Sequence, residues 1–443
     1  WALNVNNIEW SRLGSVWPAS GIYLKYLENP EKKTRSLLGS IKFMRLGDLG
    51  QLLTSLLPND DEIRKNIERY SLQGDISNLV FSIKKSEDAK TDFYYKFDFN
   101  RFTIQNWIKN LSIEGLTGSI AANRLGGYLK LDSKKAKAVL PHIFAQPITT
   151  DIAQGVIKWK KTGKTLEVYS DNLKLKNSHV STSSKFKLKL EKDKPDFLDL
   201  KLTFSKGDIS HYQHYLPIYI IKPKVQKWLR SAISGGRLTK GWASYKGILK
   251  KGTFNKGKNI LVVDFDVTGV KLKYHENWPA IKQLAANIRF YGKSLTVQLQ
   301  EGMVSGMEML STNVSIPRLG KKSTLSIQGN LLGKTQDLIK FFSAIPSKSR
   351  KNDFLDRFKA SGNAAVGAYI VLPLYDLAQD ELAKRKFFGK IELYKSRLKH
   401  TYWKSELSNI SGKLNFESEG NFVKLHSEQM TGRYREKKIG INI

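Results

Sequence analysis

Apolar residues recur at every second position over long stretches of the chain, with charged or hydroxylated residues between them. Residues 198–205 read Leu-Asp-Leu-Lys-Leu-Thr-Phe-Ser, and residues 261–268 read Leu-Val-Val-Asp-Phe-Asp-Val-Thr. Successive side chains of a strand point to opposite faces of a sheet, so this alternation predicts strands with one apolar face and one polar face. No helix-rich stretch of sequence is predicted that could cover the apolar face.

Five short segments are predicted to be helices. They are Leu46–Leu56, Asp61–Tyr70, Ser133–Leu140, Lys224–Ser234 and Thr335–Ala344. The fourth has the clearest pattern, because Trp228 and Leu229 share one face and Gly235 follows its last turn. Two such large side chains need an apolar surface to lie on. We therefore expect this helix to plug or brace the sheet.

Three stretches look like versions of one unit, in which two alternating strands flank a Gly-containing turn. They run from Trp107 to Leu131, from Trp278 to Leu299 and from Trp403 to Leu425. This arrangement is typical of β-hairpins. Their spacing along the chain is irregular, which argues against a solenoid of fixed period. It favours a sheet that grows by the addition of similar hairpins.

The chain is strongly basic, with 74 Lys and Arg against 40 Asp and Glu and a formal net charge of +34. Most of the Lys residues alternate with apolar ones, as in the segment 185–190, which reads Lys-Phe-Lys-Leu-Lys-Leu. Such alternation is typical of the solvated face of a sheet. A functional attraction to anionic lipid head groups is the alternative, and we expect no binding of nucleic acid.

Cysteine is absent, which excludes disulfides and thiolate metal sites. The longest apolar stretch, Ala364–Ala378, is interrupted by Gly367, Pro373 and Asp376, so it predicts a strand and a turn rather than a membrane span. The chain opens at Trp1 in the middle of an alternating pattern. We expect any signal or membrane anchor of the parent protein to lie outside this sequence.

Few residues of the chain have the types and spacing of catalytic or metal-binding sites. His211 and His214 stand three apart near Asp208, but in an extended segment they would point to opposite faces, so we expect no metal there. Asp264 and Asp266 share a face between apolar neighbours, as the polar side of a strand should, and have no evident acid or base partner.

The segment Gly329–Thr335 reads Gly-Asn-Leu-Leu-Gly-Lys-Thr and superficially resembles a phosphate-binding loop. Such a loop needs four residues between its glycines, and only three are present. We predict a turn followed by a capped helix, and no nucleotide. The sequence therefore predicts neither a cofactor nor a metal, and no enzyme.

Residues 215–297 resemble the central signature of a known family, the YhdP branch of the AsmA-like envelope proteins of Gram-negative bacteria. The residues that carry the resemblance are Tyr215, Pro217, Trp228, Leu229, Gly236, Gly241, Tyr245, Gly247, Trp278 and Pro279. The flanks are similar too, with Gly-rich hairpins from Trp107 to Trp159 and Leu-Pro-Leu at residues 372–374. The chain departs from the family after Gly247, where only Phe254 remains of a Phe-Pro-Phe element.

The resemblance implies a mostly β fold: a long, strongly curved antiparallel sheet, open along one side, with a few short helices. It implies a bridge-like lipid transfer protein that carries phospholipids across the periplasm through a hydrophobic groove toward the outer membrane. The parent protein would be anchored in the inner membrane by a segment outside this chain, with an unknown partner at the outer membrane or in the periplasm. We expect one elongated segment, 1–443, with hairpin units in 1–210, the family signature in 211–300 and further hairpin units in 301–443.

We expect the inward residues of the best-alternating strands to line the groove and bind lipid. They are Leu198, Leu200, Leu202, Phe204, Val263, Phe265, Val267, Leu272, Tyr274, Ile288, Phe290, Leu295, Val297, Leu299, Ile391, Leu393, Leu414 and Phe416. For each of them, packing in a closed core is the alternative. For the protein, the alternatives are a transmembrane or surface β-protein without lipid transport, or a basic nucleic-acid-binding protein.

Overall fold

The computed structural model describes residues 1–12, 15–31, 33–86, 89–107, 110–217, 221–250, 257, 259–276, 278–344, 355–375, 384–419 and 422–442. Phe254, and Asp376 in the predicted turn after Pro373, lie outside these residues. The described part is mostly β, with a few short helices, as predicted.

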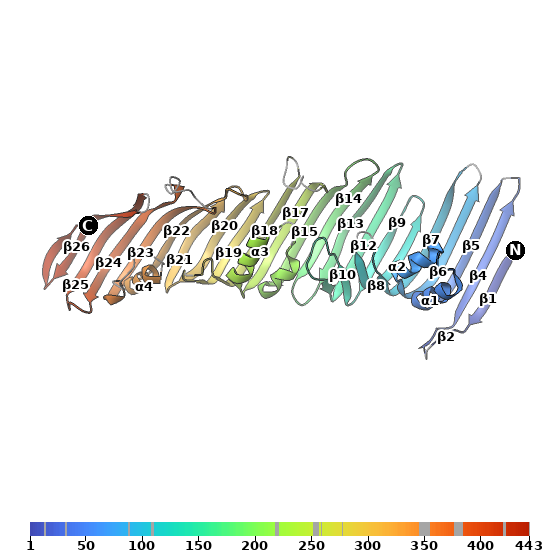
Figure 1. Ribbon diagram of the computed structural model, residues 1–443, viewed down its shortest axis with the longest axis horizontal. Helices are drawn as coiled ribbons and strands as arrows, with labels where there is room; N and C mark the ends of the chain where they lie inside the picture. Colours follow the sequence, from blue (N-terminus) through green and yellow to red (C-terminus); the bar gives the residue numbers. More distant parts are fainter. Residues whose placement is uncertain are drawn as a thin grey trace. The chain divides into compact units, whose positions relative to one another are not determined.

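Strands occupy most of the chain (Figure 1). The strands up to residue 208 are β1 (Ala2–Ile8), β2 (Ser11–Arg12), β3 (Ser15–Val16), β4 (Ser20–Asn29), β5 (Thr34–Arg45), β6 (Gln73–Ser86), β7 (Ala89–Ile104), β8 (Ser112–Asn123), β9 (Gly126–Ser133), β10 (Ala136–Val139), β11 (Ile148–Thr150), β12 (Ile152–Thr162), β13 (Thr165–Lys176), β14 (Ser181–Glu191) and β15 (Phe197–Asp208). The later strands are β16 (Ile233–Ser234), β17 (Arg237–Ile248), β18 (Ile260–Leu272), β19 (Ile281–Tyr291), β20 (Ser294–Val304), β21 (Met307–Ile316), β22 (Thr324–Lys334), β23 (Phe358–Pro373), β24 (Lys386–His400), β25 (Glu406–Glu419), β26 (Phe422–Tyr434) and β27 (Lys437–Ile441).

The described helices are short. They are α1 (Leu46–Leu56), α2 (Glu62–Tyr70), α3 (Pro223–Ala232) and α4 (Thr335–Ala344), with the 3₁₀ helices η2 (Ile209–Tyr215) and η3 (Leu355–Arg357). Four of the five predicted helices are therefore confirmed. Asp61 caps α2 as its sequence suggests, because its carboxylate accepts hydrogen bonds from the backbone N–H groups of Ile63 and Arg64.

The predicted helix Ser133–Leu140 is wrong, because this segment contains strand β10. Ala138 pairs with Ile113 of β8 and with Ile148 of β11, so the backbone of β10 is hydrogen-bonded to strands on both sides. Ala136 is buried there. Alanine fits a sheet as well as a helix when packing decides, and two partner strands outweigh its helix propensity.

The predicted turn at Gly329 is also wrong, although the helix after it is confirmed. Strand β22 continues to Lys334 and stays in register with β23, from Gly329 opposite Ala368 to Lys334 opposite Asn363. A Cβ at Gly329 would come within 2.3 Å of the Thr312 side chain, so the glycine leaves room for a neighbour on β21.

In the described part of the chain, twenty-five strands form one long antiparallel sheet, and β2 and β3 form a separate two-stranded one. Most neighbours in the sheet are also neighbours in sequence. Among the described residues the sheet does not close on itself, since β1 pairs with β4 and β27 pairs with β26.

The chain forms two compact units. Unit 1 comprises residues 1–204, 211–223 and 244–259, and unit 2 comprises residues 205–210, 224–243 and 260–443. Each has its own apolar cluster. In unit 1 the cluster is centred on Ile76, Phe99 and Leu131.

Candidate functional site

In unit 2, one face of the sheet carries an apolar residue from each of seven neighbouring strands. We call this set the central row. In the order of the strands, it consists of Phe265, Ile288, Val297, Val314, Ile327, Ile370 and Phe387. Each residue lies directly opposite the next, which places all seven side chains on the same face. All seven are half-buried.

Further apolar residues run beside the central row. Val263 lies opposite Phe290, Phe290 opposite Leu295, and Leu295 opposite Ile316. On the other side, Val267 lies opposite Ala286. The apolar face is therefore several residues wide along each strand as well as continuous across the strands.

The opposite face of the same strands is polar. The residues next in sequence to members of the central row form what we call the polar row. They are Asp266, Asn287, Gln298, Asn313 and Gln328, each opposite the next. A one-residue shift along each strand thus exchanges an apolar side chain for a polar one.

The two carboxylates of this polar face are held by neighbours. The amide of Asn287 donates hydrogen bonds of 2.8 Å to both Asp264 and Asp266. The guanidinium of Arg289 lies 3.8 Å from the Asp264 carboxylate, and the ammonium of Lys240 lies 3.7 Å from that of Asp266. These contacts fit the predicted role of a solvated strand face rather than general acid or base chemistry.

Helix α4 covers a different part of the apolar face. Leu338 of the helix packs with four sheet residues, and we call the group the α4 patch. Its members are Met307, Leu338, Ala364, Val366 and Ile391, all at most 9% exposed. Ile327 and Ile370 of the central row lie four residues along β22 and β23 from Leu331 and Val366, and neither belongs to the cluster around the α4 patch.

Unit 1 has an equivalent row. It consists of Leu3, Leu24, Gly39, Phe81, Tyr95, Ala122, Gly127, Trp159, Val168 and Leu188, each opposite the next. Two of its members are glycines that lie beneath large neighbours. A Cβ at Gly127 would come within 2.6 Å of the Trp159 ring, and one at Gly39 within 2.5 Å of the Phe81 ring.

Strand β7 contributes to this face an aromatic series that is not among the residues predicted from the sequence. The rings of Phe93 and Tyr95 stack at 6.0 Å, and those of Tyr95 and Phe97 stack at 5.9 Å. Phe99 continues the series with an edge contact to Phe97. The signal was present in the sequence, because these four aromatic residues occupy every second position.

The structure distributes the predicted groove residues over six strands and one loop. Val263, Phe265, Ile288, Phe290, Leu295 and Val297 come together in two adjacent rows of unit 2. Val267 and Leu299 are buried at one side of these rows. Leu198, Leu200, Leu202 and Phe204 alternate along β15 in unit 1 and are half-buried.

The remaining predicted groove residues pack against other parts of the chain. Ile391 is in the α4 patch, and Leu393, Leu414 and Phe416 pack against it. Leu272 lies opposite Ile281 and Ile233. The ring of Tyr274 makes an edge contact with Trp278, and burial raises the pKa of its phenol to about 12.

The family-signature residues of unit 2 hold α3 and the strands near it. The indole of Trp228 donates a 3.1 Å hydrogen bond to the carbonyl of Tyr274, although the side chain itself is 44% exposed. Leu229 is half-buried on the same helix. Gly236 adopts φ +95°, and a Cβ there would come within 2.7 Å of Val270. Gly241 is half-buried in β17, and Pro279 precedes β19.

Other signature residues belong to unit 1. Tyr215 accepts a 2.8 Å hydrogen bond from the Asn177 amide, and Pro217 forms an isolated bridge with Phe144. Tyr245 is buried, and its hydroxyl donates to the Ile248 carbonyl at 2.8 Å. Gly247 lies against Asn259, whose side chain occupies the space of a Cβ.

The two histidines considered for a metal site are not in an extended segment, so that part of the prediction is wrong. They lie in η2, where residues three apart share a side, and their rings are 5.9 Å apart. His179 stacks on His211 at 3.7 Å and on His214 at 5.7 Å. Among the described residues, no group of three or more His, Asp or Glu side chains is arranged to hold a metal ion.

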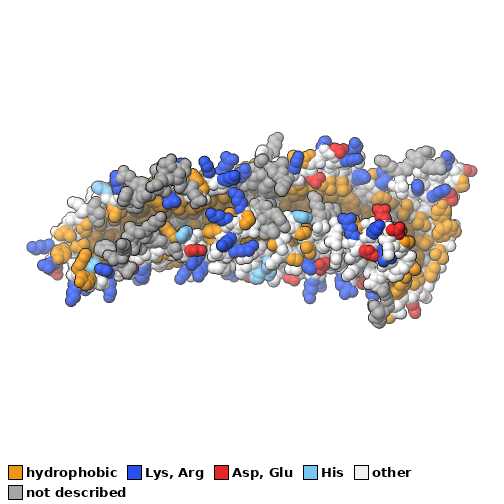
Figure 2. All heavy atoms as spheres, in the orientation of Figure 1, with side chains coloured by type: hydrophobic (Ala, Val, Ile, Leu, Met, Phe, Trp, Pro, Cys, Tyr) orange, Lys and Arg blue, Asp and Glu red, His pale blue; other side chains and the backbone are white. Residues whose placement is uncertain are grey.

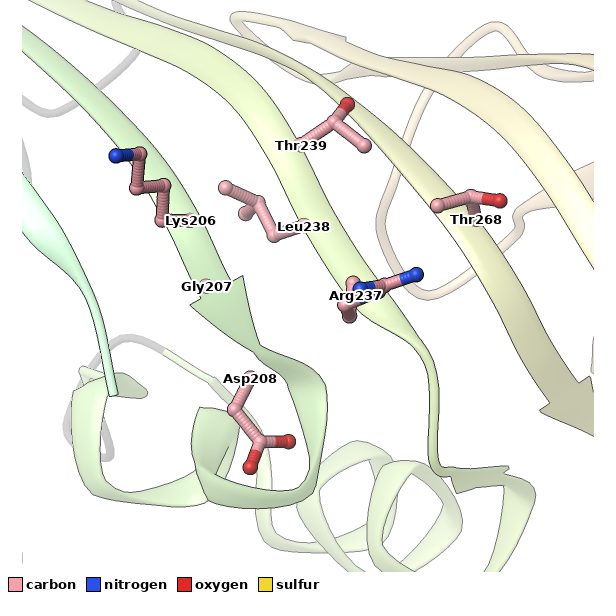
Figure 3. A pocket seen from close by; sticks show the side chains of 7 residues that line it. All are labelled: Lys206, Gly207, Asp208, Arg237, Leu238, Thr239 and Thr268. Atoms are coloured by element: carbon pink, nitrogen blue, oxygen red, sulfur yellow. The ribbon is translucent and has the colours of Figure 1, made fainter. Parts of the chain in front are cut away.

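A pocket of about 640 Å³ lies in unit 2 between the ends of β15, β17 and β18 (Figure 3). Its lining residues are Lys206, Gly207, Asp208, Arg237, Leu238, Thr239 and Thr268. The Asp208 carboxylate accepts a 2.9 Å hydrogen bond from the backbone N–H of Ser210, and the hydroxyl of Thr239 donates to the carbonyl of Asp266. These contacts are structural, and none of the predicted groove residues lines the pocket.

Within each unit, Figure 2 shows hydrophobic side chains in a recess, with Lys and Arg side chains along its margins. None of the helices in the described ranges is both long enough and apolar enough to cross a membrane.

Comparison with known proteins gives a consistent result. The family described as "YhdP protein" matches residues 1–442. The intermembrane phospholipid transporter YhdP of Escherichia coli (strain K12) is 20% identical over 452 residues, which is 100% of this chain and 34% of the relative. The chain thus spans about a third of that relative's length. No solved structure matches it.

Proposed function

Because this chain belongs to the YhdP protein family, we propose that it takes part in phospholipid transport between two membranes and that its apolar sheet face binds the acyl chains. The proposal covers both the central row of unit 2 and the equivalent row of unit 1. In it, the protein carries lipid across the periplasm of a Gram-negative bacterium without a chemical step. An anchor in the inner membrane and a partner at the outer membrane would be supplied outside this chain.

The energetics of lipid transfer explain why an apolar face would be useful. A phospholipid has roughly 30 methylenes in its acyl chains, and each costs about 0.8 kcal/mol in water. Full exposure would therefore cost on the order of 25 kcal/mol, and unaided crossing of an aqueous gap would be very slow. A continuous apolar surface removes most of that cost while the head group stays in solvent.

The observation that carries the proposal is the register of the central row. Seven strands in succession place an apolar side chain at the same height on the same face, and each remains half-buried. A sheet that only needed a core would bury such a row beneath helices or a second sheet. A row that is continuous and still partly accessible is what a sliding acyl chain requires.

Helix α3 has a supporting role in this proposal. Its Trp228 bonds to the backbone of the segment after β18, and Ala232 at its end is buried. We assign α3 the role of a brace that holds the segment after β18.

Photo-crosslinking tests the proposal. A photoreactive phenylalanine derivative at Val297 should crosslink to phospholipid in cells, because this position belongs to the central row. The same derivative at Gln298 serves as the matched control, since it lies on the next residue and the opposite, polar face. Equal crosslinking at both positions, or none at Val297, would contradict the proposal.

A charged side chain in the row should block transport. Val297→Arg is expected to abolish lipid transfer and crosslinking from a photoreactive derivative at Ile288, its neighbour in the central row, because a guanidinium among acyl chains is costly to desolvate. Gln298→Arg adds the same charge to the solvated face and should leave both unchanged. Far-UV circular dichroism of the two variants checks that the sheet is retained.

A further inference from the structure

Two turns at one end of the strands of unit 2 form a basic surface beside the apolar face. Strands β19 to β22 are antiparallel, so the turn after β19 and the loop after β21 lie at the same end of these strands. The backbone N–H of Leu319 donates a 2.6 Å hydrogen bond to the carbonyl of Lys293, so the two turns are in direct contact.

The formal charge of these two turns is of one sign. Lys293, Arg318, Lys321 and Lys322 are all exposed. Neither residues 291–300 nor residues 315–325 include an Asp or a Glu. Within the part of the chain that the structure describes, none of the four cations forms an ion pair. We call these four residues the basic turns.

The loop that carries three of the four cations is held in place by Ser323. Its buried hydroxyl accepts a 2.8 Å hydrogen bond from the N–H of Gly320 and lies 3.1 Å from the carbonyls of Arg318 and Gly320. The carbonyl of Ser323 accepts a hydrogen bond from the N–H of Leu374 after β23. The backbone that presents the cations is therefore fixed to the sheet.

Polarity changes in a graded way from the basic turns into the apolar face. Leu319, in the loop after β21, is 38% exposed. One step further in, Leu295 lies opposite Phe290 and Ile316. The order of cation, partly exposed aliphatic side chain and apolar row matches the order of phosphate, glycerol ester and acyl chain in a phospholipid.

The opposite ends of the strands of unit 2 have mixed charge. There Lys340 pairs with Asp337 at 3.1 Å, and Arg397 pairs with Glu406 at 3.2 Å. The uniformly basic charge is thus a local property of these two turns and not simply a result of the high Lys content.

We propose that the basic turns bind the phosphate of phospholipid head groups while the acyl chains lie on the apolar face, and that they select phospholipids with net negative head groups. This inference rests on the proposed function and adds to it a class of cargo and the end of the strands along which head groups travel. An exposed ammonium or guanidinium attracts a head group of net negative charge more strongly than a zwitterionic one, so four of them together favour anionic phospholipids.

The test uses the full chain and vesicles of phosphatidylethanolamine that contain a tenth of fluorescent lipid with identical acyl chains. The fluorescent lipid is either phosphatidylglycerol or phosphatidylethanolamine. We expect the protein to extract phosphatidylglycerol at least about fivefold more than phosphatidylethanolamine at low salt. The variant Lys293→Gln/Arg318→Gln/Lys321→Gln/Lys322→Gln should reduce the ratio to less than about twofold and still extract phosphatidylethanolamine.

The matched control removes the same number of charges elsewhere in unit 2. Lys359, Lys395, Lys399 and Lys404 lie toward the other end of β23 and β24, and all are exposed. Their quadruple change to Gln should keep the preference. If the basic-turn variant fails to fold, the double variant Lys321→Gln/Lys322→Gln should still lower the ratio by about half.

The outcomes separate this inference from the proposed function. If the wild-type protein extracts both lipids equally, or if the basic-turn variant keeps the preference, the head-group inference is wrong and transport on the apolar face remains. If the wild-type protein extracts neither lipid, the proposed function fails and the inference fails with it.

Discussion

Two regions of the same sheet face in unit 2 have similar residues and different surroundings. The α4 patch consists of aliphatic side chains at most 9% exposed, because Leu338 of α4 fills the space above them. The central row, on the same strands β22 and β23, is equally apolar and only half-buried. Apolar composition therefore does not distinguish a core from a binding surface, whereas the presence of a covering element does.

The difference in cover predicts a difference in what each region contributes. Side chains beneath α4 are shielded from water by the helix above them and by their neighbours in the sheet, and this burial stabilises the fold. Side chains of the central row are shielded only by their neighbours in the sheet, so part of their apolar surface stays available to a ligand. Substitutions beneath α4 should therefore act mainly on stability, and substitutions in the central row mainly on lipid binding.

The largest effect is expected from Leu338→Ala. This side chain is 5% exposed and packs against the α4 patch, so its truncation leaves a cavity and should lower the free energy of unfolding by about 2–5 kcal/mol. The urea-induced unfolding midpoint measures this loss. The matched control is Leu332→Ala, because Leu332 lies on β22 and is 43% exposed; its change should cost less than about 0.5 kcal/mol.

Equal losses for the two leucine variants would contradict the comparison. They would mean that burial of Leu338 against the α4 patch contributes no more to the free energy of unfolding than the exposed side chain of Leu332 does.

The faces of the strands could be predicted from the sequence, whereas the cover could not. Alternation with a period of two is a local property of the chain, so residues such as Phe265 and Val297 were assigned to the apolar face from their neighbours alone. The position of α4 above Ile391 depends on the pairing of β22, β23 and β24, and bulges shift that register. One such shift lies between Ser361 and Asn363, and another between Leu393 and Ser396.

Strand pairing also explains why one predicted helix is wrong and why part of the central row could not be predicted. The segment at Ala136 has helix-forming residues, but strands on both sides of it determine its conformation. The aromatic series of β7 was missed although Phe93, Tyr95 and Phe97 alternate plainly. Val314 and Ile370 entered the central row only when the register became known, because nothing in their local sequence ties them to Val297 or Ile327.

An intermediate effect is expected where α4 is attached to the sheet. The hydroxyls of Thr335, the first residue of α4, and Ser396 of β24 are 2.7 Å apart and fully buried. Thr335→Val should cost about 1–2 kcal/mol, because it leaves the Ser396 hydroxyl with only a 3.3 Å contact to the Asn363 carbonyl.

A double-mutant cycle measures whether this pair acts as a unit. Thr335→Val combined with Ser396→Ala should cost less than the sum of the two single changes, since the second removes the group that the first leaves unsatisfied. Strict additivity of the unfolding free energies would show that the hydroxyl pair does not attach α4.

The smallest effect on stability is expected in the central row, and it gives the sharpest comparison. The chain has no cysteine, so a single introduced thiol reports its own accessibility. Ile327→Cys in the central row should cost about 1 kcal/mol and react readily with a water-soluble maleimide, because the side chain it replaces is only half-buried. Ile391→Cys, the same change beneath α4, should react at least about tenfold more slowly, as its position is 9% exposed.

Phospholipid vesicles should slow the reaction at Ile327→Cys and leave that at Ile391→Cys unchanged, since only the first position is open to acyl chains. Protection of both positions, or of neither, would mean that the two regions do not differ in their access to lipid.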